Sequence, residues 1–290
     1  MEQTVSLIGF GEAGWTFAMA GGWAHAASVF DCKSNDEDAR AAMMSRFAQA
    51  GVLDMSDTAA VMHGASLILS LVTADQALAV AREAAQSIMP GALYCDLNSV
   101  APQTKRAAAQ AVEAAGGCYV DVAVMAPVDP ARLAVPLLLS GARADDAQAR
   151  LSALGFRNTR IVGAEVGRAS SIKMIRSVMV KGMEALTAEC VLAAQAADVL
   201  DEVIASLDTS EKPRPWRERA DYNLDRMMVH GLRRAAEMEE VVATLDDLGT
   251  GAAMTRGTVT RQRAIGALEI GDPPEGLVAK IARIGTTSAS

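Results

Sequence analysis

The sequence predicts an α/β protein in which a doubly wound parallel sheet is followed by an all-helical domain. Up to about residue 165, short β-branched runs alternate with alanine-rich helical stretches. After Gly167 the strand-like runs stop and helical patterns take over. The chain has 290 residues, which exceeds the usual size of one domain, about 150 residues. We therefore expect two domains, residues 1–166 and 167–290.

Each predicted strand is a short apolar run bounded by turn-forming residues. The predicted strands are residues 4–8, 27–31, 66–72, 91–97, 118–124, 136–141 and 158–163. Between them, residues 75–88 and 102–115 have the spacing of amphipathic helices. Strands that alternate with helices in this way form a parallel sheet that helices cover on both faces.

The C-terminal part is predicted to be helical throughout. Residues 169–207 form one long predicted helix, which two prolines within residues 208–216 bring to an end. Further helices are predicted at residues 217–248, 251–268 and 274–284. In the first helix a stripe of apolar residues recurs at helical spacing, and we expect it to be buried. This stripe consists of Ile172, Ile175, Met179 and Met183.

Composition argues against several classes of partner. A net charge of −8 and a pI near 5.0 argue against nucleic acid and anionic membranes. No apolar run reaches the ~18 residues of a membrane span. The cysteines are far apart and form no CxxC pair, so we expect small apolar fillers in a reduced compartment and no metal site. The N-terminus does not resemble a secretory signal, and a cytoplasmic protein is predicted.

A glycine-rich stretch at the N-terminus predicts a dinucleotide site. Gly9, Gly11 and Gly14 follow a predicted strand and open a helix, which is the context in which G-x-G-x-x-G binds a dinucleotide. Gly9 permits the tight turn, Gly11 lets the pyrophosphate approach, and Gly14 lets helix and strand pack closely. The domain is thus a predicted Rossmann domain. The expected cofactor contacts in this loop are Gly9, Phe10, Gly11, Glu12, Ala13 and Gly14.

The nature of the cofactor is indicated by Asp31, which ends the second predicted strand. A carboxylate there can accept hydrogen bonds from the adenosine ribose hydroxyls and would repel a 2′-phosphate. NAD is therefore favoured over NADP, although Lys33 and Ser34 lie close enough to keep NADP open. Val72 and Thr73, at the end of the third predicted strand, are also expected to contact the cofactor.

Asn98 and Ser99 follow the predicted strand 91–97, at the edge of the sheet where ligands bind. Their amide and hydroxyl groups could hold a substrate hydroxyl or carboxylate, and Asn98 is also an expected cofactor contact. Alternatively, both residues cap the helix that starts near Pro102. The spacing alone leaves the two interpretations open.

Three separated motifs resemble those of the β-hydroxyacid dehydrogenases. GFGEAG at the N-terminus, DLNSVAP at 96–102 and GRASSIKMIRS at 167–177 occur in the order seen in that superfamily, which includes 3-hydroxyisobutyrate, tartronate-semialdehyde and 6-phosphogluconate dehydrogenases. The segment DYNLDRMMVHGLRRAAEMEEV resembles a bacterial 6-phosphogluconate-dehydrogenase-like branch. The resemblance implies an active site between a Rossmann domain and a helical domain. It also implies that Lys173 is catalytic, that Asn98 and Ser99 bind substrate, and that Asp96 is structural.

The chain departs from the pattern of that superfamily at several positions. Ser177 stands where the family has asparagine, and Arg176 where the 6-phosphogluconate enzymes have histidine. Met125 and Ala126 replace residues of a glycine-rich turn, and His230 replaces a lysine. The resemblance therefore does not extend to the identity of the substrate. The further expected substrate contacts are Met125, Arg176, Ser177 and His230.

Lys173 and Arg176 share one face of their helix, one turn apart. Oxidation of an alcohol needs a group that accepts the hydroxyl proton, and a lysine does so when its pKa lies near the working pH. We expect the charge of Arg176 and the helix N-terminus to lower the pKa of Lys173. Arg176 also predicts an acidic substrate. His230, with Arg233 and Arg234 on its face, is predicted to form an anion site or a solvated basic face.

The sequence thus predicts an NAD(P)-dependent oxidoreductase that acts on a small β-hydroxy acid or related alcohol, with Lys173 as general acid and base. The alternatives are an imine or ketone reductase of similar architecture and a non-catalytic NAD(P)-binding sensor. Lys173, Asn98 and Ser99 together favour the dehydrogenase. The long helix 169–207 would extend roughly 57 Å, beyond its own domain, and so predicts a homodimer or a dimer of dimers.

Overall fold

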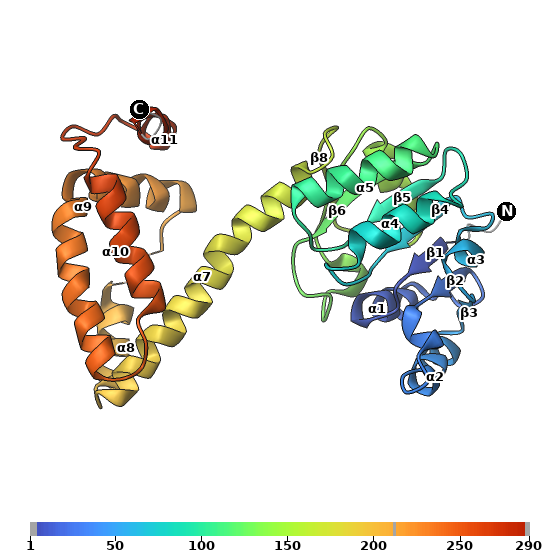
Figure 1. Cartoon of the computed structure of the whole chain (residues 1–290), viewed down its shortest axis with the longest axis horizontal. Helices are drawn as coiled ribbons and strands as arrows, with labels where there is room; N and C mark the ends of the chain where they lie inside the picture. Colours follow the sequence, from blue (N-terminus) through green and yellow to red (C-terminus); the bar gives the residue numbers. More distant parts are fainter. Residues whose placement is uncertain (1–4, 211–212, 288–290) are drawn as a thin grey trace. The chain divides into compact units, whose positions relative to one another are not determined.

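The computed structural model describes residues 5–210 and 213–287. The chain divides into two compact units, residues 1–178 and 179–290, and helix α7 (Arg168–Ala196) belongs partly to each (Figure 1). The predicted domain boundary at residue 166 stays a prediction. Thr4 of the first predicted strand and residues 211–212 of the predicted break lie outside the described residues.

The first unit contains a doubly wound sheet, as predicted. Its described residues form eight strands in the order β3-β2-β1-β4-β5-β6-β7-β8, and every neighbouring pair is parallel except β6 and β7. The strands are β1 (Val5–Ile8), β2 (Ala27–Phe30), β3 (Leu53–Asp54), β4 (Leu67–Ser70), β5 (Leu93–Asp96), β6 (Cys118–Val124), β7 (Leu137–Ser140) and β8 (Thr159–Gly163). Strand β3 was not predicted, because two exposed residues leave no apolar pattern.

The strand order reverses at β1, which pairs with β2 on one side and with β4 on the other. In doubly wound sheets, ligands bind at the carboxyl ends of the strands beside such a reversal. Here β1 leads into the glycine loop and β4 leads into the segment that starts at Leu71. The two segments are adjacent, since the Leu71 N–H donates to the Ile8 carbonyl oxygen at 2.8 Å.

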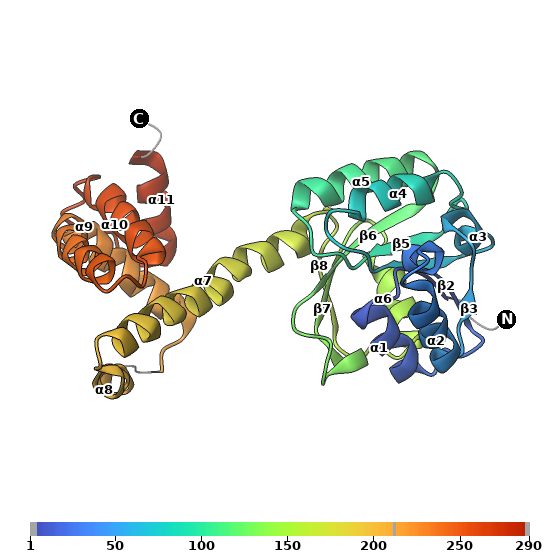
Figure 2. The same cartoon turned by 60° about the horizontal axis from the view of Figure 1, so that its bottom comes forward.

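Helices cover both faces of this sheet. One face carries α1 (Glu12–Gly21), α2 (Arg40–Ala50) and α6 (Ala144–Ala153), and the other carries α3 (Thr58–Met62), α4 (Ala77–Ala85) and α5 (Pro102–Ala114) (Figure 2). Short 3₁₀ turns follow β2 (Cys32–Asn35) and precede β7 (Arg132–Ala134). The side chains of β1 alternate between two cores: Val5 and Leu7 join the first, and Ile8 joins the second.

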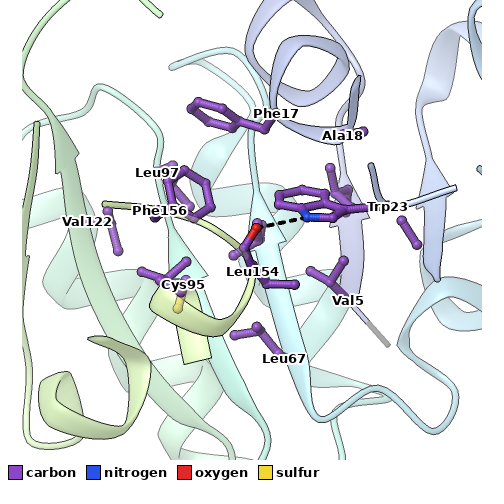
Figure 3. Close-up of a cluster of buried hydrophobic side chains, with 14 of the residues drawn as sticks. Val5, Phe17, Ala18, Trp23, Leu67, Cys95, Leu97, Val122, Leu154 and Phe156 are labelled. Atoms are coloured by element: carbon purple, nitrogen blue, oxygen red, sulfur yellow. Dashed lines mark hydrogen bonds between the residues drawn. The ribbon is translucent and has the colours of Figure 1, made fainter. Parts of the chain in front are cut away.

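Trp23 anchors the first of these cores just after α1. Its indole Nε1 donates to the Leu154 carbonyl oxygen at 3.0 Å, and its ring lies 6.1 Å from that of Phe156 (Figure 3). A Cβ atom at Gly21 would lie 2.1 Å from the indole nitrogen. The end of α1 therefore tolerates no side chain where Trp23 turns back over it.

The described part of the second unit is helical, as predicted. The prediction of a single helix over residues 169–207 is wrong. Helix α7 ends at Ala196, and Asp198 adopts a left-handed backbone with φ of 58°, which aspartate tolerates better than most residues. The apolar, alanine-rich pattern continues through this break, and so the sequence conceals it. The remaining helices are α8 (Leu200–Ser210), α9 (Trp216–Asp247), α10 (Ala253–Gly266) and α11 (Leu277–Thr287).

The predicted burial of the apolar stripe on α7 is also wrong. Ile172 packs partly against the core of the first unit, but Ile175 is 71 % exposed, and Met179 and Met183 are exposed as well. None of the described residues of α8 is buried, although Val203, Ile204 and Leu207 recur at helical spacing. Helical spacing of apolar residues thus identified the helices but not what covers them.

Glu189 joins α7 to the start of α10. Its carboxylate accepts hydrogen bonds from the N–H groups of Met254 and Thr255, both at 2.9 Å, and from Thr255 Oγ1 at 2.6 Å. Burial would raise the pKa of Glu189, but these hydrogen bonds outweigh it and hold the pKa below its ordinary value. A negative charge at the N-terminus of a helix also stabilises the helix, because it interacts favourably with the helix dipole.

The described helices include none that is both long and apolar enough to cross a membrane. Within the same residues, no group of histidine, cysteine, aspartate or glutamate side chains is arranged to hold a metal ion.

Two glycines allow α9 and α10 to cross closely. A Cβ atom at Gly231 would lie 2.5 Å from the Gln262 carbonyl oxygen and 2.8 Å from Gly266 Cα. A Cβ atom at Gly266 would in turn lie 2.4 Å from the Leu232 nitrogen. The backbones are in contact at this point, so any side chain must push the helices apart.

We expect Gly231→Ala to destabilise the protein by ~1–3 kcal/mol, because the added methyl group overpacks the crossing. The matched control is Gly257→Ala in α10, where a Cβ atom would meet no described atom within 4 Å. This variant should be stabilised by ~0.5–1 kcal/mol, since alanine favours the helix. Thermal unfolding followed by circular dichroism checks both values, and equal shifts in the two variants would contradict the close crossing.

Candidate functional site

The glycine loop between β1 and α1 has little room for side chains. Gly9 has a φ of +93°, and a Cβ atom there would lie 2.5 Å from the Leu71 carbonyl oxygen. A Cβ atom at Gly14 would lie 2.7 Å from the Gly9 carbonyl oxygen. Phe10 is fully buried with its ring 5.3 Å from that of Phe47, so only its backbone faces the loop. The loop is therefore a tight turn held against α1 and the segment that follows β4.

Gly11 differs, because the space beside it is open. A Cβ atom there would meet no atom of the described chain within 4 Å. Gly11 is also the N-cap of α1, and no described side chain caps that helix, so its first N–H groups remain available. Arg46 adds positive charge, since its Nη2 donates to the Gly11 carbonyl oxygen at 3.2 Å. Open space, free N–H groups and a cation suit a pyrophosphate at this helix N-terminus.

Asp31 lies beside the glycine loop and is also hydrogen-bonded to it. Its Oδ2 accepts a hydrogen bond from the Phe10 N–H at 2.7 Å, and its Oδ1 accepts one from the Lys33 N–H at 3.0 Å. Each carboxylate oxygen retains a lone pair that could accept a ribose hydroxyl. Asp31 thus stabilises the turn, a role that its spacing in the sequence did not reveal.

Asn98 links the ends of β4 and β5. Its Oδ1 accepts a hydrogen bond from the Val72 N–H at 2.7 Å, and its Nδ2 donates to Ser70 Oγ at 3.0 Å. The side chain is nearly buried, with 5 % exposed. Asn98 therefore fixes the backbone at Val72 and Thr73, two of the predicted cofactor contacts.

Ser99 is exposed and lies against Lys173. Nζ of Lys173 donates to Ser99 Oγ at 2.5 Å, which joins the segment after β5 to the second turn of α7. Asn98 and Ser99 do not cap α5, which was the alternative interpretation. The N-cap of α5 is Ala101, and no described side chain caps that helix. The structure thus brings together Asn98, Ser99 and Lys173, which the sequence could only align by motif.

Four further predicted residues lie near Lys173 or belong to the other unit. Arg176 is exposed, and its Nη1 donates to the Met125 carbonyl oxygen at 3.5 Å, so both flank the same end of α7. Ser177 Oγ donates to the carbonyl oxygen of Lys173 at 2.9 Å, a bond within the helix. His230 lies in α9 of the second unit and is partly exposed. Its role at the substrate site stays a prediction.

Beneath this site lies a buried cluster of charged side chains. Asp96 of β5 and Asp121 of β6 stand side by side in the register of the two strands, and both are fully buried. Lys105 of α5, also fully buried, places Nζ 2.9 Å from Asp96 Oδ1 and 3.5 Å from Asp121 Oδ1. Adjacent carboxylates repel each other, so this pairing of strands depends on the ammonium between them.

Within this cluster, Asp96 is well supplied with hydrogen bonds. Burial raises the pKa of Tyr119, and the charge of Asp96 raises it further, so the hydroxyl stays protonated and donates to Asp96 Oδ2 at 2.5 Å. Lys105 Nζ donates in addition to the Asp96 carbonyl oxygen at 2.6 Å. Each buried ion has given up its hydration, so removal of one charge leaves the other buried without a partner. Such a removal lowers the free energy of unfolding by ~3–5 kcal/mol.

Lys105 was not predicted to be a site residue, although its position in the sequence is unusual. The buried residues of α5 are Lys105, Ala108, Ala109 and Val112, so the lysine stands on the apolar stripe of an amphipathic helix. A charge at such a position needs a buried partner of opposite charge. The aspartates within the apolar strands β5 and β6 were the candidates. By contrast, burial raises the pKa of the Cys95 thiol to about 12, in line with its predicted role as an inert filler.

Family models match both units of the chain. The NAD binding domain of 6-phosphogluconate dehydrogenase matches residues 4–163, more than half of the chain. A domain described only as of unknown function matches residues 194–265. The chain therefore belongs to the family that carries the NAD binding domain of 6-phosphogluconate dehydrogenase. The predicted Rossmann fold and the predicted dinucleotide cofactor are confirmed.

Solved structures support the same assignment. A conserved hypothetical protein from Sinorhizobium meliloti 1021 is 38 % identical, with 99 % of this chain and 97 % of that chain covered and a TM-score of 0.61. A conserved protein of unknown function with structural similarity to 3-hydroxyacid dehydrogenases is 28 % identical, with coverages of 91 % and 97 % and a TM-score of 0.58. An imine reductase from Myxococcus stipitatus in complex with NADP⁺ is 19 % identical, with coverages of 97 % and 99 % and a TM-score of 0.72, and shares the fold.

We expect Gly11→Ala to weaken NADH binding by ~10-fold or more, because the methyl group would occupy the space that the pyrophosphate approaches. Its melting temperature should not fall, since the added Cβ meets no described atom within 4 Å. Gly9→Ala should instead lower the melting temperature, because the methyl group collides with Leu71. Calorimetric titration with NADH and thermal unfolding distinguish the two effects. Unweakened NADH binding by Gly11→Ala would contradict this placement of the cofactor.

Proposed function

We propose that this protein is an NAD(H)-dependent oxidoreductase that transfers a hydride between the nicotinamide and a small β-hydroxy acid or related alcohol. The observation that carries the proposal is the contact of 2.5 Å between Lys173 Nζ and the exposed Ser99 Oγ. The contact follows β5, at the carboxyl edge of the sheet that also carries the glycine loop. A proton-accepting amine beside a hydroxyl suits the oxidation of an alcohol.

Each residue of the site has a chemical task in this proposal. When bound, the nicotinamide accepts the hydride from the alcohol carbon during oxidation and returns it during reduction. Lys173, in its amine form, accepts the proton of the substrate hydroxyl, and in its ammonium form it returns that proton. Ser99 Oγ, held by Lys173, orients the substrate oxygen toward Nζ. Arg176 binds an acidic group of the substrate through its planar fork of donors.

NAD(H) is the proposed coenzyme in preference to NADP(H). The support is Asp31, whose carboxylate is held in place by the Phe10 and Lys33 N–H groups. In a site of reduced dielectric, a fixed negative charge disfavours a 2′-phosphate.

Two other functions would give different outcomes when the protein is tested with a panel of hydroxy acids, oxo acids, imines and ketones. A non-catalytic sensor would bind NADH and turn over no hydroxy acid, oxo acid, imine or ketone. An imine reductase, the class with which the chain shares its fold, would reduce cyclic imines with NAD(P)H and leave hydroxy acids unoxidised. Oxidation of hydroxy acids with NAD⁺ at alkaline pH is the outcome that the dehydrogenase proposal requires.

The second unit is proposed to assemble with a second copy of the chain. Helix α8 has no buried residue among those described, although its apolar residues form a stripe. Leu186 and Leu192 of α7 and Leu207 of α8 are 48 %, 59 % and 51 % exposed. Exposed apolar surface of this extent is typical of an interface. We propose a homodimer or a dimer of dimers.

Lys173→Met and Lys173→Ala are each expected to lower kcat by ~10²-fold or more, because the general acid and base is lost. Lys173→Arg should not restore activity, since a guanidinium stays charged. NADH affinity, measured by titration, should stay unchanged in all three.

The matched control is Lys181→Met, which removes an exposed lysine from the same helix and should retain full activity. A Lys173→Met enzyme with more than about a tenth of the normal kcat, in an assay limited by chemistry, would remove Lys173 from the mechanism.

Arg176→Ala is expected to raise KM for acidic substrates roughly 10- to 100-fold, the value of a charged hydrogen bond. KM for neutral alcohols should change little, because they lack the anionic group. Steady-state kinetics with a matched acid and its neutral amide analogue provide the measurement. Equal losses for both substrates would show that Arg176 acts on structure alone.

Light scattering at micromolar concentration is expected to give at least twice the chain mass of 30.3 kDa. Leu207→Glu should yield monomers, because it places a charge on the apolar stripe of α8. The control is Glu202→Lys, which changes the charge on the opposite side of α8 and should leave the assembly intact. A monomeric, active wild-type protein would refute the proposed assembly.

A further inference from the structure

The buried carboxylate of Asp96 fixes the segment that carries Ser99. Its Oδ1 accepts a hydrogen bond from the Asn98 N–H at 2.8 Å, and its Oδ2 accepts one from the Tyr119 hydroxyl at 2.5 Å. The side chain of Asn98 is itself bonded to the segment after β4. The peptide that leads to Ser99 is therefore held on both sides, and its position depends on Asp96.

The buried carboxylate of Asp121 fixes the first turn of α7. Lys173 lies in the next turn of the same helix. Asp121 Oδ2 accepts hydrogen bonds from the N–H groups of Gly167 at 3.2 Å and Ser170 at 3.0 Å. Ser140 Oγ donates to the same oxygen at 3.3 Å and accepts a further N–H from that turn. Side chains of the sheet thus bind the N–H groups with which the helix begins. The direction in which Lys173 projects follows from this anchor.

Lys105 connects the two carboxylates. Its Nζ lies 2.9 Å from Asp96 Oδ1 and 3.5 Å from Asp121 Oδ1, and its side chain has no exposed surface. Charges in such an interior are screened far less than surface charges, so a displacement of one carboxylate is felt by the other. The segment of Ser99 and the start of α7 are therefore coupled through one ammonium group.

From this geometry we infer that Lys105 and Asp121 are positioning residues for proton transfer. Together with Asp96 they hold Ser99 and Lys173 against each other. The inference rests on the proposed function for the role of Lys173. The coupling between the two segments can be measured without any catalytic assay.

A purely stabilising role is the competing explanation. Buried ion pairs are weak contributors to stability, because the loss of hydration offsets their attraction, whereas they can fix a particular geometry. A stabilising role predicts a lower melting temperature and normal kcat in the folded protein. A positioning role predicts a lower kcat with NADH binding retained.

Asp121→Asn is the main test. Asparagine retains an acceptor for the N–H groups of α7 but removes the charge that faces Lys105. Hydrogen exchange of the full-length chain, measured by mass spectrometry, should accelerate in residues 165–171. It should also accelerate in residues 96–99, to which the side chain of Asp121 makes no hydrogen bond. The kcat should fall about 10-fold, as expected for a small displacement of reacting groups, and the Kd for NADH should change less than about threefold.

Tyr119→Phe is the reciprocal variant. It removes the hydroxyl that donates to Asp96 and should accelerate exchange in residues 165–171, at the far end of the cluster. This variant keeps the ring and the charges, so it tests the coupling even if Asp121→Asn does not fold.

Leu151→Ala is the control for stability. Leu151 is fully buried in α6 and belongs to the apolar core. This variant should lower the melting temperature and leave kcat within about twofold, because the positions of Ser99 and Lys173 are unchanged.

Two results would overturn the positioning role. In the first, exchange accelerates only next to each changed residue, or no more than in the Leu151→Ala control. In the second, the kcat of Asp121→Asn is normal although Lys173→Met is inactive. An active Lys173→Met enzyme would instead contradict the proposed function, and the exchange measurements would still decide the coupling.

Discussion

A lysine ammonium without exposed surface determines how the first unit is assembled. Lys105 needs negative partners, and the two aspartates that supply them would repel each other without it. Their strands, β5 and β6, can adopt the observed register because α5 brings a positive charge to the point where they meet. The same row continues outward to Ser70 of β4 and Ser140 of β7, both fully buried. Four neighbouring strands thus present polar side chains at one level.

That polar row lies directly beneath the carboxyl edge of the sheet. Ser70 holds the side chain of Asn98, and Ser140 holds the first turn of α7. Above the row, the backbone enters the loops that carry the exposed groups. The buried charges therefore also help to fix the conformation of the loops at this edge of the sheet.

The sequence predicted the features that depend on local pattern. Alternation of apolar runs gave seven strands and the order of the domains, and the glycine spacing gave the turn after β1. It could not predict that Asn98 and Ser99 leave α5 uncapped, because their partners, Val72 and Lys173, lie far away in the chain. The break at Asp198 was concealed for another reason: the apolar pattern runs through it.

The site shows the same division between pattern and partner. Motif and resemblance identified Lys173, but the contact with Ser99 requires the fold. Lys105 carries no motif, and its burial follows from the pairing of two strands. Sequence periodicity predicts that a residue faces the interior of the protein. It does not predict which residue of opposite charge pairs with it there, because that depends on the tertiary fold.

Asp31 stabilises the glycine turn in addition to its proposed role in the choice of coenzyme. Its carboxylate accepts N–H groups from both the glycine turn and the segment after β2. A mutational path toward a phosphorylated coenzyme that starts by removing this carboxylate would first leave the Phe10 and Lys33 N–H groups without their acceptors. The accessible path runs instead through the neighbouring exposed positions, Cys32 and Lys33, whose side chains can change while the turn stays intact. The architecture of the loop thus constrains the order in which new coenzyme preferences can be acquired.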